Sequence, residues 1–226
     1  MQLTFLEHSC VVLRGTKTIA IDPFVPSGFP TDIKPDVVVL THAHGDHLGI
    51  AIELQAHTIC MNELAYYLRE QGLSTDPMNI GGTIVHEGVT YTMTWATHSS
   101  CLDVENNGKF AGKRYAGSPA GFVITMDEVT IYHAGDTGLF SDMRLIGELY
   151  RPNIAFLPIG GRYTMGPREA MIAAEFIGAK KVVPIHYNTS PHVQLSEEEI
   201  QSFKTTIERT TDISVTLLKP GESIEL

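Results

Sequence analysis

The chain has 226 residues, of which 43% are hydrophobic and 19% are charged, and its mean hydropathy is +0.02. This composition predicts a globular protein with a sizeable core and excludes a disordered or fibrous chain. The net charge of -10 at pH 7 argues against nucleic acid as a partner, because binding to phosphates depends on clustered Lys and Arg.

The cysteines and the N-terminus indicate the compartment. Cys10, Cys60 and Cys101 are odd in number and form no C-x-x-C pair, so we expect free thiols in a reducing environment. The first residues lack the basic head and apolar stretch of a signal peptide, and no apolar run approaches the ~20 residues of a membrane helix. The expected location is the cytoplasm, without membrane contact; assembly into a homo-oligomer is left open.

Strand signals predominate in the first forty residues. Cys10–Arg14 and Thr18–Ile21 are β-rich runs separated by residues 15–17, which suits a hairpin. Residues 36–40 contain an uninterrupted apolar run, which is typical of a strand buried on both faces. The first part of the chain is therefore predicted to form a sheet.

Helix signals come later in each half of the chain. Apolar residues recur at helical spacing in residues 61–68, before Gly72, and in residues 170–177, between Pro167 and Gly178. Both segments are predicted to be amphipathic helices that pack against a sheet.

Three further segments carry local signals. Ser196 and Glu199 have the spacing of a capping box and predict a last helix. Pro220 and Gly221 predict a turn within a final pair of strands. Residues 103–119 are polar and rich in glycine, and we expect a loop over the active site there.

A weak internal repeat indicates how the elements are arranged. Residues 11–22 and 122–136 both read as strand, turn, strand and aspartate, and each is followed by a basic residue, a proline and a buried strand. The repeat predicts one domain over residues 1–226, built from two related halves at about 1–118 and 119–226. Two sheets would then pack face to face with helices outside. The alternative is a chance likeness between two strand–turn–strand patterns.

The densest group of chemically active residues directly follows the buried strand at residues 36–40. His42, His44, Asp46 and His47 lie within six residues, and small residues between them allow a tight turn. Imidazole and carboxylate ligands together suit Zn, Mn or Fe. The alternation of ligand-type and small residues favours a metal site over a surface cluster without a role.

Three later residues could complete such a site. His98, Asp136 and His186 each follow an apolar run that reads as a strand. A sheet edge would present all three to a shared cleft, so they are predicted to join the cluster.

With these residues the chain resembles the metallo-beta-lactamase superfamily over essentially its whole length. The resemblance implies an α/β fold of the four-layer αββα type, in which two mixed sheets pack together and the metals lie at one edge. It also implies which residues bind the two metals and which one bridges them. The implied ligands are His42, His44 and His98 for the first metal, Asp46, His47 and His186 for the second, and Asp136 between them.

Further motifs narrow the resemblance. Residues 7–10, 21–24, 133–137 and 158–167 are similar to a bacterial and archaeal branch of metal-dependent hydrolases that is related to the manganese-using L-ascorbate-6-phosphate lactonases. True beta-lactamases do not usually carry a histidine at the position of His47. The chain is also too short for the inserted domain of the nuclease branch.

The predicted function is hydrolysis of an ester, lactone or phosphoester bond in a small substrate. An anionic substrate is compatible with this prediction. Two divalent metals lower the pKa of a bound water, and the resulting hydroxide is the nucleophile. The expected cofactors are two divalent ions, of which Zn is favoured and Mn or Fe also suits the ligands. The catalytic candidates are Asp46, Asp136 and His8. The alternatives are a phosphodiesterase acting on nucleotides or nucleic acid, and a non-catalytic metal-binding sensor.

Several residues are predicted to support the site. His8 could contact the substrate, serve as an additional ligand or have a structural role. Asp22 and His133 are expected to hold ligands or neighbouring structure rather than to bind metal. Arg162 and Thr164 are candidate substrate contacts, because the backbone N–H groups before Pro167 could hold an anion; helix capping is the alternative.

Other polar residues are read as surface or structural residues. The basic residues near the predicted loop, Lys109, Lys113 and Arg114, could contact an anion, although solvated charge is the commoner role. His57, His86 and His192 have no ligand-like neighbours in the sequence, so no metal role is predicted for them.

Overall fold

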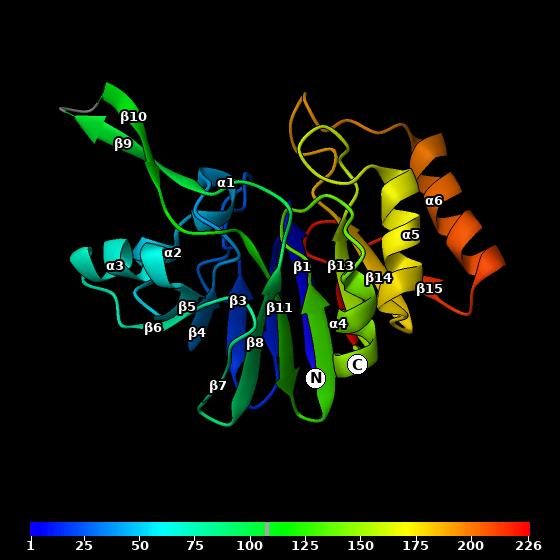
Figure 1. Cartoon of the computed structure of the whole chain (residues 1–226), viewed down its shortest axis with the longest axis horizontal. Coiled ribbons are helices and arrows are strands. Elements are labelled where there is room, and N and C mark those ends of the chain that lie inside the picture. The colour runs from blue at the N-terminus through cyan, green and yellow to red at the C-terminus, as the bar shows by residue number, and fades with distance from the viewer. Residues whose placement is uncertain (107–108) are drawn as a thin grey trace.

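Strands that are apolar on both faces determine the layers of the molecule. In the computed structural model, which describes residues 1–106 and 109–226, alternate residues of these strands point to different cores. Val37 and Val39 face the core between the sheets, while Val38 packs under the helices on the outside. The strands therefore lie in the two middle layers of a sandwich, with helices on either side (Figure 1). This arrangement confirms the predicted αββα fold.

The first sheet has seven strands within the described residues, in the order β16-β1-β2-β3-β4-β5-β6. The strands β3 to β6 run parallel, and the strands on the other side are antiparallel. The strands are β1 (Gln2–Glu7), β2 (Cys10–Arg14), β3 (Thr18–Ile21), β4 (Val37–Val39), β5 (His57–Met61), β6 (Thr75–Met78) and β16 (Ser223–Glu225).

The second sheet, again among described residues, has the order β15-β14-β13-β12-β11-β8-β7. In this sheet each strand from β12 to β15 runs parallel to the next. The strands β7, β8, β11 and β12 run antiparallel to one another in that order. The strands are β7 (Thr83–His86), β8 (Val89–Trp95), β11 (Ala120–Met126), β12 (Val129–His133), β13 (Ile154–Pro158), β14 (Lys181–Ile185) and β15 (Ser214–Val215).

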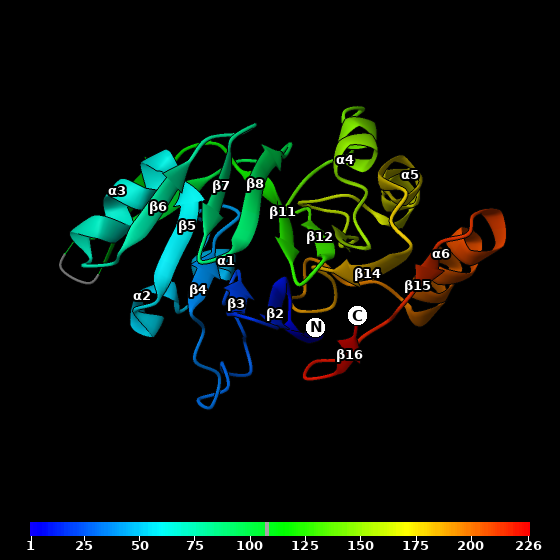
Figure 2. The same cartoon turned by 90° about the horizontal axis from the view of Figure 1, so that it is seen from below.

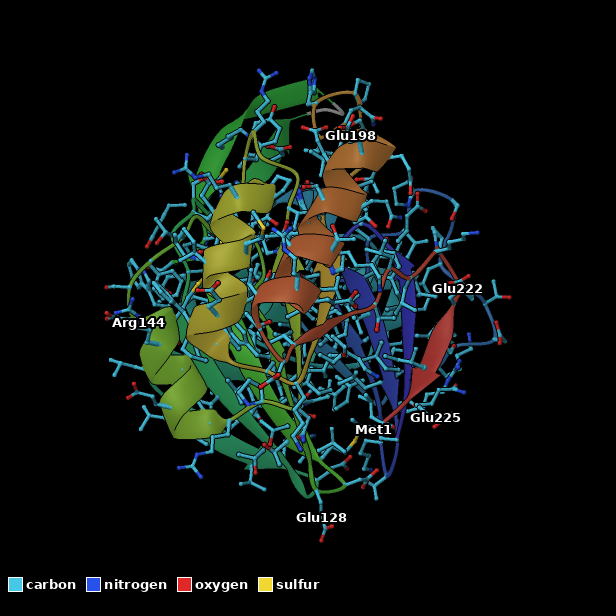
Figure 3. All side chains as sticks on the ribbon, turned by 90° about the vertical axis from the view of Figure 1, so that its right-hand side faces the viewer. Met1, Glu128, Arg144, Glu198, Glu222 and Glu225 are labelled. Carbon is cyan, nitrogen blue, oxygen red and sulfur yellow. The ribbon has the colours of Figure 1, made fainter. Side chains whose placement is uncertain are left out.

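Helices cover the outer face of each sheet. The first sheet is covered by α1 (Gly45–Leu48), α2 (Ala51–Leu54) and α3 (Asn62–Glu70), and the second by α4 (Met143–Tyr150), α5 (Pro167–Ile177) and α6 (Glu197–Thr210) (Figure 2). Figure 3 shows α5 and α6 side by side, with Arg144 on α4 and Glu198 near the start of α6. The helices predicted near residues 61–68, 170–177 and 197 onward are confirmed. Throughout the described part of the chain, no helix is both long and apolar enough to cross a membrane.

The two sheets repeat one layout. The hairpin β2–β3 continues into parallel β4, and the hairpin β11–β12 continues into parallel β13. The predicted strand–turn–strand repeat is therefore present in the structure as two equivalent hairpins. The division into halves near residue 118 stays a prediction.

Two sequence predictions were wrong. A loop was predicted over residues 103–119, but within the described residues β9 (Cys101–Asn106) and β10 (Lys109–Tyr115) pair as antiparallel strands. Nor do the last two strands pair with each other: β15 lies beside β14, while β16 lies beside β1 in the other sheet. The turn at Pro220 and Gly221 instead returns the chain to β1, where the Gly221 N–H donates to the Phe5 carbonyl.

Candidate metal centre

The turn after β4 brings the first group of imidazoles together. Small Ala43 and Gly45 allow the chain to turn sharply into α1, so His42 and His44 lie on the same side of the turn. Nε2 of His42 is 2.9 Å from Nδ1 of His44. The His98 ring, which follows β8, lies 5.1 Å from the His42 ring and 5.2 Å from the His44 ring between centroids. These three side chains form a group whose nitrogen atoms could share one ion.

A second group lies beside the first. It contains His8, Asp46, His47 and His186, which offer ligand atoms within 4.8 Å of one another. Nε2 of His8 is 3.2 Å from Oδ2 of Asp46, and Nε2 of His186 is 3.9 Å from the same oxygen. The structure therefore places His8 among the predicted ligands of the second metal.

Asp136 lies between the two groups. Its Oδ1 is 3.2 Å from Nε2 of His47, and its Oδ2 is 3.1 Å from Nε2 of His186 and 3.6 Å from Nε2 of His98. Its carboxylate thus contacts histidines of both groups, which is the position that a bridging ligand needs.

The sheets deliver these residues from the carboxyl ends of their strands. His8 follows β1, His98 follows β8, and His186 follows β14. His8 and His186 both adopt left-handed backbone conformations, and the His186 N–H donates to the His8 carbonyl oxygen at 2.8 Å. This hydrogen bond joins the ends of strands from different sheets and places both imidazoles in one cluster.

Asp22 holds the cluster from behind. It is fully buried, and its Oδ2 is 2.7 Å from Nδ1 of His47. The backbone N–H and the hydroxyl of Thr41 also donate to its carboxylate. Asp22 therefore fixes the His47 ring with Nε2 facing Asp136, which is the kind of contact predicted for it.

His133 faces away from the cluster. Its Nε2 donates to the Ser9 carbonyl oxygen at 2.9 Å, and its Nδ1 accepts the Gly135 N–H at 3.2 Å. Gly135 has a φ of 61°, and an added Cβ would lie 2.8 Å from the Ala120 carbonyl oxygen. His133 therefore shapes the tight turn that presents Asp136, and both of its nitrogens are used in doing so.

The histidines of the cluster differ in their protonation. Burial alone would lower the pKa of His47, but Asp136 and Asp22 raise it well above its usual value, so a cation bound there would take the place of a proton. Burial lowers the pKa of His42 well below its usual value and also lowers the pKa of His44 and His98. Burial alone would raise the pKa of Asp136, but His47 and His186 hold it well below its usual range. Neutral imidazoles and a charged carboxylate are the forms that bind metal.

Unpartnered polar atoms test whether a metal fits. Among the described residues, Nε2 of His47, Oδ1 of Asp136 and Nε2 of His186 are buried and have no hydrogen-bond partner. Leaving such atoms unpaired costs free energy, so native proteins pair them with protein, water or metal. The atoms converge on one place, and imidazole with carboxylate suits Zn, Mn or Fe. The residues present therefore fit divalent cations.

A cavity of 510 Å³ opens above the cluster. Besides several of the predicted ligands, Ser99, Lys113 and Tyr163 line it. Arg162 and Thr164 do not line it: Arg162 is exposed beside His192, and Thr164 is buried. Tyr163 was not among the predicted substrate contacts, although its two neighbours were, because no sequence signal separates the three residues.

The three basic residues named as possible anion contacts lie in different places. Lys113 forms an ion pair with Asp103 at 2.6 Å across the paired strands β9 and β10. Arg114 points to another face, where it lies 3.7 Å from Glu70. The side chain of Lys109 lies outside the described residues.

Comparison with protein families identifies one domain model. The beta-lactamase superfamily domain matches residues 19–187, which include all the predicted metal ligands. Two similar curated relatives are each named UPF0173 metal-dependent hydrolase. The protein from Methanoculleus marisnigri is 58% identical over 100% of this chain and 97% of its own length, and the one from Methanospirillum hungatei is 55% identical over 100% and 99%.

Solved structures give the same result for the fold. A metallo hydrolase from the hyperthermophilic archaeon Ignicoccus hospitalis is 35% identical, with a TM-score of 0.85 over 99% of this chain and 97% of its own. An isothiocyanate hydrolase from Delia radicum gut bacteria is 21% identical, with a TM-score of 0.74 over 100% and 99%. At that identity the second likeness concerns the fold alone.

Proposed function

Since this chain belongs to the beta-lactamase superfamily and is one of its metal-dependent hydrolases, we propose that it uses two divalent cations to cleave an ester, lactone or phosphoester bond. We infer a small substrate, because the cavity above the cluster measures 510 Å³. Zinc is our favoured ion, since imidazoles dominate the cluster.

The observation that carries the proposal is the position of Asp136. One carboxylate lies beside His98 of the first group and beside His47 and His186 of the second, and unpartnered atoms of His47 and His186 face it. A single ion would leave one group without a partner. His42, His44 and His98 would hold one cation, and Asp46, His47 and His186 the other, with Asp136 shared.

Bound cations would supply an activated water and polarise the oxygen of the substrate. The protein residues then have separate tasks. Asp46 is partly exposed to the cavity and accepts a hydrogen bond from His8, so its other oxygen can orient a water or take up a proton.

His8 is restrained on both ring nitrogens. Nδ1 pairs with the Thr189 hydroxyl and Nε2 with Asp46. Burial lowers the pKa of His8, which favours the neutral ring. We assign His8 the role of positioning the Asp46 carboxylate.

The metal content of the purified chain tests the proposal. We expect about two tightly held cations in the active centre of the wild type and clear loss from Asp136→Ala, because that residue serves both groups. The matched control is Asp212→Ala, which removes an exposed carboxylate that is not one of the predicted ligands. Elemental mass spectrometry gives the stoichiometry, and hydrolysis of lactone and phosphoester substrates should fall together with it.

Other outcomes separate the alternatives. If Asp136→Ala kept all of its metal and its turnover, the two-cation assignment would be wrong. Cleavage of bis-p-nitrophenyl phosphate without cleavage of any lactone would favour a phosphodiesterase. A fully loaded chain that cleaved no ester, lactone or phosphoester would favour a metal-binding sensor.

A further inference from the structure

Two histidines and an aspartate meet at the end of the sandwich opposite the catalytic cluster. His57 begins β5 and pairs with Val37, which begins β4, whereas His42 follows the other end of β4. His86 ends β7, and Asp76 lies in β6. The three strands are neighbours at one side of the molecule in Figures 1 and 2. These histidines have no ligand-like neighbours in the sequence, because their partners are distant along the chain.

The three side chains converge on one carboxylate oxygen. Oδ2 of Asp76 is 3.2 Å from Nε2 of His57 and 3.1 Å from Nδ1 of His86. The two imidazole rings stack with centroids 4.1 Å apart and an angle of 7° between their planes. All three ligand atoms lie within 4.8 Å of one another.

One of these nitrogens lacks a hydrogen bond. Nε2 of His57 is buried and has no hydrogen-bond partner, although the Asp76 oxygen is close. The other nitrogen of the same ring, Nδ1, is held 2.9 Å from the Ser74 hydroxyl. A ring fixed through one nitrogen, with the other unpartnered among ligand-type atoms, is the usual arrangement of a metal-binding histidine.

We propose that His57, Asp76 and His86 form a separate site for one divalent transition-metal cation of the zinc class. Bonds of about 2.0–2.1 Å in a tetrahedral site place neighbouring ligand atoms about 3.3 Å apart, close to the separations from Asp76. Water would occupy the fourth position, since Asp76 is partly exposed. Two imidazoles and one carboxylate favour zinc over calcium or magnesium, which prefer oxygen ligands.

The site joins the two sheets. β6 is the edge strand of the first sheet and β7 the edge strand of the second. A cation held by Asp76 on β6 and His86 on β7 therefore links these edges directly. The role of this cation is structural. It connects the two sheets at the end of the sandwich that lies opposite the catalytic cluster.

Zinc stoichiometry of chelated and reconstituted protein tests the proposal. We expect His86→Ala and Asp76→Asn each to bind one zinc equivalent fewer than the wild type and to keep the hydrolytic activity. Asp76→Asn preserves the shape of the side chain. If this variant binds less zinc, the cause is therefore the missing negative charge and not a disrupted fold. His192→Ala is the control, because it removes an exposed histidine outside the cluster.

The same substitutions in the Asp136→Ala background separate this site from the catalytic one. The zinc that Asp136→Ala still binds should fall by one equivalent when His86→Ala is added, whatever the state of the catalytic cluster. If both His86→Ala and Asp76→Asn bound as much zinc as the wild type, the cluster would be a metal-free hydrogen-bonded group and the proposal would be overturned.

Discussion

Asp22 determines the orientation of a predicted ligand without being one itself. It has a left-handed φ of 46° and contacts both Thr41 and His47 from a fully buried position. We expect Asp22→Asn to weaken metal binding at the catalytic cluster by about 10–100-fold, because the uncharged amide holds the His47 ring less firmly. Asparagine tolerates the left-handed conformation, so the fold should persist.

Competition with a zinc chelator measures that loss. Asp36→Asn is the matched control, since Asp36 also accepts a backbone N–H but is exposed and far from the cluster. Equal zinc affinity of Asp22→Asn and the wild type would contradict the role of Asp22.

At the residue scale, the sequence predicted the positions of those side chains that come directly after a strand. His98, Asp136 and His186 each follow an apolar run, and a sheet edge brings such residues together whatever the details of packing. Tyr163 and the His57 cluster were missed. The position of Tyr163 depends on the path of an irregular segment, and the His57 cluster depends on how two sheets are superposed.

At the scale of elements, α6 shows how local chemistry determines a boundary. The Ser196 hydroxyl accepts the Glu199 N–H, and the Glu199 carboxylate accepts the Ser196 N–H. We expect Ser196→Ala to lower the free energy of unfolding by about 1 kcal/mol, because an N-terminal N–H of the helix loses its partner.

Urea unfolding followed by circular dichroism checks this loss. Ser202→Ala is the control, since Ser202 is exposed in the middle of the same helix, where alanine is the better helix former. A midpoint for Ser196→Ala no lower than that of Ser202→Ala would show that the cap contributes nothing.

Elements with such local signals were predictable, and elements without them were not. α3, α5 and α6 have apolar spacing together with terminal residues that define their ends. The strands β9 and β10 are polar and few of their described side chains are buried, so their sequence resembles that of a loop. These strands are held together by backbone hydrogen bonds. Because backbone pairing does not require alternating apolar residues, the sequence carries no pattern that would indicate it.

At the scale of the whole molecule, both sheets contribute to one buried polar cluster. The clustered histidines and carboxylates have unpartnered atoms that a cation would satisfy. Metal removal should therefore destabilise the whole fold. Free metal at about a thousand times its dissociation constant would stabilise the native state by about 4 kcal/mol per site.

Calorimetry of the His86→Ala protein isolates this effect from the separate site. We expect the melting temperature to fall after chelation and to recover when zinc is added. A melting temperature that chelation did not change would mean that the cluster holds no metal that matters for stability.

The pairing of β16 with β1 has a consequence for how the molecule is made. Residues 223–225 cover the open side of β1, and more than two hundred residues separate the two strands in the chain. During synthesis on the ribosome, β1 emerges more than two hundred residues before its partner β16. Until then the first sheet presents an unpaired edge, which is the kind of surface that attracts other unfinished chains. Completion of this sheet is therefore a late, long-range step, and chaperones that shield exposed strands would act before it.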